Sequence, residues 1–301
     1  INSFFAAHAT VRLPWRPSAV AKALKSKKRF SSSSKPLAVT CFLTNGAAFD
    51  ILIKQEDVRT DKLAMVVGYW ISAVTEHVHV HSYDVFPFSD SAGCLVMIPN
   101  AETLYDIRKT TTLLNFVMTH NPNMTSRQMR ECMVASCAGA CLLAFTMGLG
   151  DRHLENIMVT QEGLLAHVDF GYVLGDDPKH VSTPMRITED MIDAIGGKAS
   201  PTFVSFVQRT QRGYEAMRFH ASLWYHLLSS ECFIFGDKSR PWKRIRDHVL
   251  DRFVPGEWDE EASLQIQTVV ERATEDTILQ RAADFMHLTS NTFGELFHME
   301  L

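Results

Sequence analysis

The stretch that decides the fold is Gly150-Asp151-Arg152-His153-Leu154-Glu155-Asn156, followed by His167-Val168-Asp169-Phe170-Gly171. Phosphoryl transfer needs few covalent contributions from a protein, but it needs positioned metal ions and charge that matches the phosphates. Asn156 and Asp169 carry oxygen ligands of the kind that Mg²⁺ prefers. They lie thirteen residues apart in the sequence, on either side of a hairpin predicted at Glu162-Gly163. We therefore expect the two side chains to meet and to hold a metal ion.

Two further side chains of the same stretch suit the acceptor hydroxyl. Asp151 and His153 come just before Asn156 and can orient or deprotonate a hydroxyl group. His167 is a third candidate for handling the proton or the charge of the transition state. The division of the base role among these three residues stays open at this point.

Together, the two motifs resemble the signature G-D-R-H-x-x-N…H-x-D-F-G of the phosphatidylinositol 3-/4-kinase superfamily, in which the H-R-D order of ordinary protein kinases is inverted. The resemblance covers roughly residues 18–290. It implies an α+β, bilobal protein-kinase-like fold with a small β-rich N-lobe and a larger, mostly helical C-lobe. It also implies a phosphotransferase that uses ATP with Mg²⁺, or with Mn²⁺ in its place.

The order of the expected elements agrees with this fold class. Leu37–Leu43 and Phe49–Lys54 predict two strands joined at Asn45-Gly46, a strong hairpin signal. The apolar spacing from residue 63 to residue 74 predicts a helix. We expect a basic, partly helical lead-in at 1–30, the N-lobe and hinge at 31–100, and the C-lobe at 101–301 with the catalytic loop, the activation loop and the C-terminal helices.

The segment from Lys54 to Asp61 is similar to the family's K-x-G-D-D-L-R-Q-D. The resemblance implies that Lys54 contacts the ATP phosphates and that Asp61 holds Lys54 by an ion pair. This sequence departs from the family pattern because it is one residue shorter and lacks the glycine.

Two other segments resemble nucleotide-binding parts of the family. Residues 32–36 are similar to its S-S-x-K-R-P loop, which implies phosphate contacts from Ser33, Ser34 and Lys35. Residues 93–100 are similar to its hinge, where backbone groups bind adenine. Val96 and Ile98 take this role here, although Val96-Met97 replaces the usual Glu-Trp pair.

The loop after Asp169 is most similar to that of the class III phosphatidylinositol 3-kinases. Its charged groups are few: Lys179, His180, Arg186, Asp176 and Asp177. A polyphosphorylated head group would want a denser basic cluster, so phosphatidylinositol itself is the expected acceptor. A Ser/Thr acceptor on protein, as in the related large protein kinases, stays open.

Charge is spread unevenly along the chain. Residues 1–49 contain eight basic side chains and no acidic one, although the whole chain carries −4. This balance indicates contact with phosphate, on a nucleotide, an anionic lipid or RNA, unless the segment is simply solvated. It also resembles an organellar transit sequence. The alternative to an enzyme is a kinase-like scaffold in a large assembly, for instance a mitochondrial ribonucleoprotein, held through residues 1–35.

The remaining expectations concern membranes, location and partners. Residues 132–150 are uncharged over a nearly membrane-spanning length, but glycines and polar residues interrupt them, so we predict a buried helix and no transmembrane segment. Six cysteines without a C-x-x-C pair favour a reducing compartment. Helices are expected at 203–219, 223–228 and from 259 to about 285, and an apolar stripe at 293–301 is assigned to packing ahead of membrane contact. Regulatory or scaffold proteins are expected partners, on a peripheral endomembrane or in mitochondria.

Overall fold

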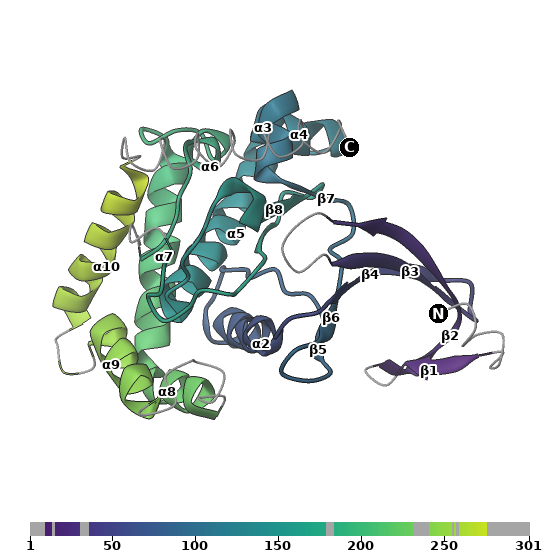
Figure 1. The fold of residues 1–301 in the computed structure, drawn as a ribbon. Coiled ribbons are helices and arrows are strands. Elements are labelled where there is room, and N and C mark those ends of the chain that lie inside the picture. Colours follow the sequence, from purple (N-terminus) through teal and green to yellow (C-terminus); the bar gives the residue numbers. More distant parts are fainter. Residues whose placement is uncertain are drawn as a thin grey trace. The chain divides into compact units, whose positions relative to one another are not determined.

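The computed structural model describes residues 10–13, 16–30, 36–178, 184–230, 241–254, 256 and 259–275. The chain divides into two compact units. Unit 1 comprises Ile1–Val66 and Ser82–Asn100, and unit 2 comprises Val67–His81 and Ala101–Leu301. The described part of unit 1 is rich in strands and that of unit 2 in helices (Figure 1), which confirms the predicted fold class.

Unit 1 is built on an antiparallel sheet of six strands in the order β1-β2-β3-β4-β6-β5. The strands are β1 (Val11–Leu13), β2 (Arg16–Arg29), β3 (Leu37–Leu43), β4 (Ala48–Lys54), β5 (Val85–Pro87) and β6 (Gly93–Val96). The hairpin predicted at Asn45-Gly46 joins β3 to β4, and Gly46 has a φ of 87°, which favours glycine.

Strand β2 corrects the prediction of a partly helical lead-in. Its Ala- and Lys-rich sequence suits a helix by intrinsic propensity. In the structure it pairs with β3 from Ala21 opposite Leu43 to Arg29 opposite Leu37. Pairing supplies the backbone hydrogen bonds that an isolated segment would lack, and Ala21 packs with Cys41 and Leu43 in a small core. Residues 16–29 are therefore an integral part of the sheet.

Helix α2 (Arg59–Val74) confirms the predicted helix and crosses the boundary between the units. In unit 2, residues 78–80 follow this helix and form no assigned strand. His79 donates its backbone N–H to Ala135 O (3.1 Å). A Cβ on Gly139 would lie 2.0 Å from His79 O, so this close approach requires glycine at position 139.

Helix α5 (Ser126–Met147) forms the centre of unit 2 (Figure 1). It begins with a capping box between Thr125 and Gln128, and it ends at Gly148 in the left-handed conformation. It is long and apolar enough to cross a membrane, but 78% of its apolar window is buried inside the protein. The prediction of a buried core helix is therefore confirmed. None of the five described cysteines forms a disulfide.

The other elements of unit 2 surround α5 or extend from it. A three-stranded antiparallel sheet consists of β7 (Ala101–Thr103), β8 (Ile157–Thr160) and β9 (Leu165–His167). The remaining helices are α3 (Leu104–Thr110), α4 (Leu113–His120), the 3-10 helix η1 (Leu154–Asn156), α6 (Glu189–Ala194), α7 (Pro201–Phe219), α8 (Ala221–Ser230), α9 (Pro241–Phe253) and α10 (Asp259–Thr274).

The helices α7, α8 and α9 share an aromatic core. Phe253 stacks on Tyr214 and on Trp224, with ring centroids 6.1 and 6.2 Å apart. Helices α7 and α8 confirm the predicted helices at 203–219 and 223–228, whereas α9 was not predicted. Helix α10 matches the described part of the helix expected from 259 to about 285. The apolar stripe at 293–301 lies outside the described residues.

Candidate functional site

Asn156 and Asp169 come together at one end of the β8–β9 hairpin. Ile157 pairs with His167, so the residue before β8 and the residues after β9 are neighbours. Val168 donates its backbone N–H to Asn156 O (3.2 Å). The hairpin turns at Gly163, whose φ is 84°. The fold therefore brings the two predicted metal ligands to the same place.

The backbone is strained at both aspartates of the site. Asp151 has a φ of 50° and Asp169 a φ of 62°. The left-handed region is unfavourable for residues other than glycine, at about 1–3 kcal/mol each, and such residues cluster at functional sites. The surrounding contacts must therefore hold both turns in place.

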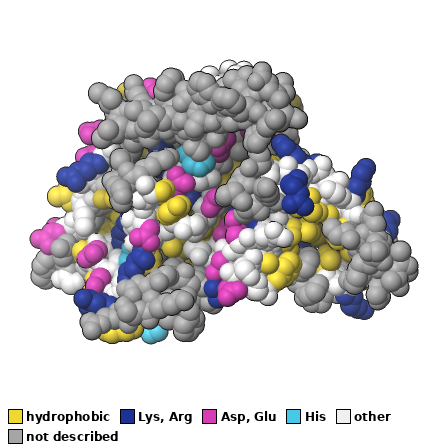
Figure 2. Space-filling view, viewed as in Figure 1, with side chains coloured by type: hydrophobic (Ala, Val, Ile, Leu, Met, Phe, Trp, Pro, Cys, Tyr) yellow, Lys and Arg dark blue, Asp and Glu magenta, His cyan; other side chains and the backbone are white. Residues whose placement is uncertain are grey.

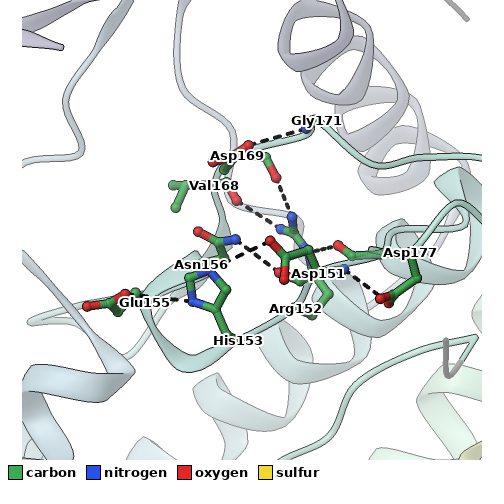
Figure 3. A network of polar contacts seen from close by, with 10 residues as sticks. Asp151, Arg152, His153, Glu155, Asn156, Val168, Asp169, Gly171 and Asp177 are labelled. Atoms are coloured by element: carbon green, nitrogen blue, oxygen red, sulfur yellow. Dashed lines mark hydrogen bonds and ion pairs between the residues drawn. The ribbon is translucent and has the colours of Figure 1, made fainter. Parts of the chain in front are cut away.

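Arg152 supplies those contacts (Figure 3). Its buried guanidinium donates from Nε to Gly150 O (2.7 Å), from Nη1 to Val168 O (2.8 Å) and from Nη2 to Asp169 O. Gly150 directly precedes Asp151, and Val168 directly precedes Asp169, so the three carbonyls lie at the two strained turns. One side chain thus ties the catalytic loop, residues 150–156, to the segment that carries Asp169.

The oxygen atoms of Asn156 and Asp169 fit a magnesium ion. The buried amide of Asn156 donates from Nδ2 to Asp151 O (3.0 Å), which leaves Oδ1 as an acceptor. The carboxylate of Asp169 is exposed, and its Oδ1 accepts a hydrogen bond from Gly171 N–H (3.3 Å). In the described part of the chain, no group of three or more His, Cys, Asp or Glu side chains is arranged to hold a metal ion by itself. Mg²⁺ at phosphate-transfer sites uses one or two carboxylates together with substrate phosphates, so two protein ligands suffice.

His153 lies between two carboxylates. Its Nε2 is 3.9 Å from Asp151 Oδ2, and its Nδ1 is 3.9 Å from Glu155 Oε2. The side chain is only 12% exposed, so these charges act through little water. The backbone N–H of His153 donates to Asp151 O (3.0 Å), which fixes the two predicted catalytic residues relative to each other.

His167 has a different environment from the other predicted catalytic residues. Its imidazole is buried, and Nε2 contacts Ala140 O of α5 (3.2 Å). Burial, with the positive charge of Arg152 nearby, lowers the pKa of His167 to about 3. The ring is therefore neutral at physiological pH, and it is better suited to joining β9 to α5 than to proton transfer.

The loop after Asp169 packs directly on the catalytic loop. Asp177 Oδ2 accepts from Asp151 N–H (3.2 Å), and a Cβ on Gly150 would lie only 2.0 Å from Asp176 O. Asp176 also pairs with Arg244 of α9 through Nη2 (2.5 Å). Asp176 and Asp177 therefore contact the catalytic loop and α9, beyond the role of offsetting nearby basic groups that the sequence suggested.

In unit 1, Lys54 ends β4 and is buried together with Asp61. Lys54 Nζ pairs with Glu56 Oε1 at 2.5 Å. Buried charges in proteins are usually paired, and Glu56 supplies the opposite charge for the Lys54 ammonium. The ion pair with Asp61 stays a prediction, and Glu56 is a partner that sequence reasoning missed.

The predicted adenine-binding residues differ in how their backbone is used. Val96 donates its N–H to Asp84 O (2.8 Å), so this group is already engaged in unit 1. Ile98 follows the end of β6, at the turn into Pro99 and Asn100. Ser33, Ser34 and Lys35 of the predicted phosphate loop lie outside the described residues, as do Lys179 and His180 of the acceptor loop.

Sequence reasoning also missed Arg152 and Asp177 as supports of the site. Both act through backbone groups, Arg152 on residues up to seventeen positions away and Asp177 on a residue 26 positions away. The position of Arg152 inside the motif could have indicated this supporting role. The strained conformation of Asp151 and Asp169 needs a hydrogen-bond donor to hold it, and a guanidinium group next to Asp151 is such a donor.

Comparison with known proteins agrees with this geometry. Residues 107–235 match the family described as phosphatidylinositol 3- and 4-kinase, and this range contains the catalytic loop and Asp169. Phosphatidylinositol 3-kinase VPS34 of Candida glabrata is 27% identical over 273 residues, which cover 86% of this chain and 30% of the relative. The VPS34 of Saccharomyces cerevisiae is 26% identical over 278 residues, 87% of this chain and 31% of the relative.

A shorter match has a higher identity. Phosphatidylinositol 3-kinase catalytic subunit type 3 of Caenorhabditis elegans is 42% identical over 96 residues, 32% of this chain and 11% of the relative. These matches confirm the resemblance to the phosphatidylinositol 3-/4-kinase superfamily that the catalytic motifs predict. Within it, they confirm the similarity to phosphatidylinositol 3-kinases of the VPS34 type. The chain spans about a third or less of the length of these relatives.

Proposed function

We propose that this chain is the catalytic domain of a lipid kinase that transfers the γ-phosphate of ATP to the inositol head group of phosphatidylinositol. The observation that carries the proposal is the convergence of Asp151, His153, Asn156 and Asp169 in one hydrogen-bonded network held by Arg152. The relatives named phosphatidylinositol 3-kinase support the choice of acceptor.

The nucleotide would be held by groups of opposite charge. Asn156 Oδ1 and the Asp169 carboxylate would hold Mg²⁺, which would supply positive charge to offset the charge of the phosphates. Lys54 would add a positive charge at the phosphates. The hydrogen bonds of Arg152 keep the Asp169 turn in its left-handed conformation, and this orients the carboxylate before any ligand arrives.

The hydroxyl proton would be taken by His153. Its Nε2 faces Asp151 Oδ2 at 3.9 Å, and Glu155 lies at the same distance from Nδ1. Two carboxylates stabilise the imidazolium that forms when Nε2 accepts a proton. Asp151 would orient both the ring and the incoming hydroxyl, and Asp177 fixes Asp151 by accepting its backbone N–H.

Partners and location follow from the acceptor. A phosphatidylinositol kinase works at a membrane surface, so we infer peripheral attachment to an intracellular membrane. The Caenorhabditis elegans relative is named a catalytic subunit, which supports action alongside regulatory proteins. The matches give no support to an RNA-bound or mitochondrial assembly factor. That hypothesis assumed a basic arm at residues 1–35, whereas residues 16–29 form a strand of the sheet.

The proposal is tested by supplying labelled ATP with Mg²⁺ and offering two acceptors, phosphatidylinositol vesicles and a generic protein substrate. We expect label in the lipid and almost none in the protein. Asp169→Ala is the loss-of-function variant, because it removes a predicted metal ligand from an exposed position. Alanine fits the positive φ of residue 169 less well than Asp does, so some loss of stability is expected and is measured separately.

Thermal unfolding of Asp169→Ala, without nucleotide, serves as the folding control. If label appeared in the protein substrate alone, the acceptor would be a Ser or Thr hydroxyl on protein and the lipid acceptor would be rejected. Absence of label in both, together with no ATP binding by the wild type, would reject the enzyme and leave a kinase-like scaffold.

A further inference from the structure

The two units carry opposite net charge. Unit 1 contains eleven basic and six acidic residues and is therefore at +5, while the whole chain is at −4, which leaves unit 2 at −9. Strand β2 concentrates the positive charge, because its fourteen residues include six Lys or Arg and no acid. Figure 2 shows dark blue side chains at the margin of the strand-rich part, at the right of the view, with no magenta side chain visible there.

Most carboxylates of unit 1 are already used by other cations. Four of the six form ion pairs: Asp50 with Lys27 (2.6 Å), Asp84 with Arg16 (2.5 Å), Glu56 with Lys54 (2.5 Å) and Asp57 with Arg59 (2.6 Å). Asp61 is buried, and Asp90 lies in the exposed connection between β5 and β6. Within the described part of unit 1, the basic side chains that remain on β2 are therefore left without neutralising carboxylates.

These side chains form what we call the basic strip: Lys22, Lys25, Lys28 and Arg29. All four are exposed, and none takes part in the ion pairs of the described residues. Lys28 Nζ lies 5.0 Å from the ring of Phe30. Strand β1 pairs with β2 only as far as Ala21, so among the described strands residues 22–29 have one open edge. Lysines on an open edge hinder unwanted strand pairing, but that role does not require an absence of nearby acids.

We propose that the basic strip binds the surface of an anionic lipid bilayer. The choice of a bilayer rests on the proposed function, since an enzyme that modifies a lipid head group works at that surface. Proteins that bind single-stranded nucleic acid interleave basic residues with aromatic stacking platforms. Strand β2 itself contains no aromatic residue, and the ring that Lys28 contacts, Phe30, follows the strand and is not interleaved with the strip. Uncompensated lysines and arginines without interleaved aromatic residues match the diffuse negative potential of a membrane that contains phosphatidylserine.

The expected strength follows from the number of charges. Each Lys or Arg near an anionic surface strengthens binding by about fivefold at physiological salt. Removing three of the four charges should therefore weaken binding about a hundredfold. The attraction is screened within a Debye length, so raising the salt concentration should weaken the wild type much more than the variant.

The test measures co-sedimentation of the full chain with phosphatidylcholine vesicles, with and without phosphatidylserine, in the absence of ATP. The strip variant is K22Q/K25Q/R29Q, which leaves the Lys28–Phe30 contact intact. The matched control is R127Q/R212Q/K243Q, which removes three exposed charges from unit 2. We expect phosphatidylserine-dependent binding by the wild type and the control, and its loss in the strip variant. Thermal unfolding should be the same for all three.

Three outcomes would overturn the proposal: equal vesicle binding by the strip variant and the wild type, equal weakening in the control, or no phosphatidylserine dependence. Tighter binding of the wild type to a mixed-sequence RNA than to the vesicles, lost in the strip variant, would assign the strip to RNA instead. Because the readout is binding without ATP, it is separate from the transfer assay. If phosphate transfer were absent while strip-dependent vesicle binding remained, the proposed kinase activity would be rejected and the membrane-binding role of the basic strip would be retained.

Discussion

Replacement of Arg152 by Met should abolish phosphate transfer while most of the fold is retained. Methionine has a similar length and remains compatible with a buried site, but it has none of the three hydrogen-bond donors that reach Gly150, Val168 and Asp169. The variant therefore isolates the contribution of these donors from the filling of space.

The magnitude follows from two opposing terms. Hydrogen bonds that involve a charged group contribute about 1.5–3 kcal/mol each, so three of them outweigh the strain of about 1–3 kcal/mol at each left-handed aspartate. Without the guanidinium, we expect both turns to relax. A displacement of about 1 Å at a reacting group costs about a hundredfold in rate. We expect kcat to fall by at least that factor, with a smaller change in the KM for ATP.

The assay is steady-state transfer to phosphatidylinositol vesicles, combined with thermal unfolding. Relaxation of the turns should limit the loss of stability to about 2–3 kcal/mol, or roughly 4–12 °C in Tm. Arg152→Lys should have intermediate activity, because one ammonium group cannot reach all three carbonyls. The control is Arg209→Met, which breaks an ion pair with Glu131 (2.7 Å) in unit 2 and should leave kcat unchanged. Transfer by Arg152→Met within threefold of the wild-type rate would refute the reasoning.

Two further predictions address the packing around the site. Gly150→Ala would place a Cβ 2.0 Å from Asp176 O, so we expect a loss of about 1–3 kcal/mol in unfolding free energy and a tenfold or greater loss of activity. Gly46→Ala, which meets no atom within 4 Å, should cost about 1–2 kcal/mol from its positive φ and leave activity unchanged; equal activity of the two variants would contradict this. His248 is buried against Thr146 O (2.8 Å), and burial lowers its pKa from 6.5 to about 4. The unfolded chain then binds the proton first, so stability should fall by about 1.4 kcal/mol per pH unit between pH 6.5 and pH 4. A chemical denaturation series at pH 7 and pH 5 should show a smaller pH effect for His248→Gln than for the wild type. An unchanged pH effect in that variant would show that another group is responsible.

The predictions that succeeded from sequence depend on local patterns. The hairpins at Asn45-Gly46 and Glu162-Gly163 are set by turn residues, and the pairing within the second one brings Asn156 and Asp169 together. The buried helix α5 was predictable because its apolar residues are continuous and charge begins immediately after its end.

The failures depend on contacts between distant residues. Strand β2 has the composition of a helix and becomes a strand because β3 offers it an edge. Helix α9 has six charged residues among its thirteen, yet Phe253 completes an aromatic core with Tyr214 and Trp224 from two other helices. The pairing of Lys54 with Glu56 is local, but a comparison with the family pattern directed attention to Asp61 instead.

The measurement that tests the central claim most directly is a single-turnover experiment with labelled ATP, Mg²⁺ and phosphatidylinositol vesicles, comparing the wild type with Asp169→Asn. The asparagine keeps the shape of the side chain and removes the charge that would hold the metal. We predict that label appears in the lipid with the wild type and falls at least a hundredfold in the variant, at equal thermal stability. Equal transfer by the two proteins, or no transfer by a wild type that binds ATP, would contradict the assignment of this site to phosphoryl transfer.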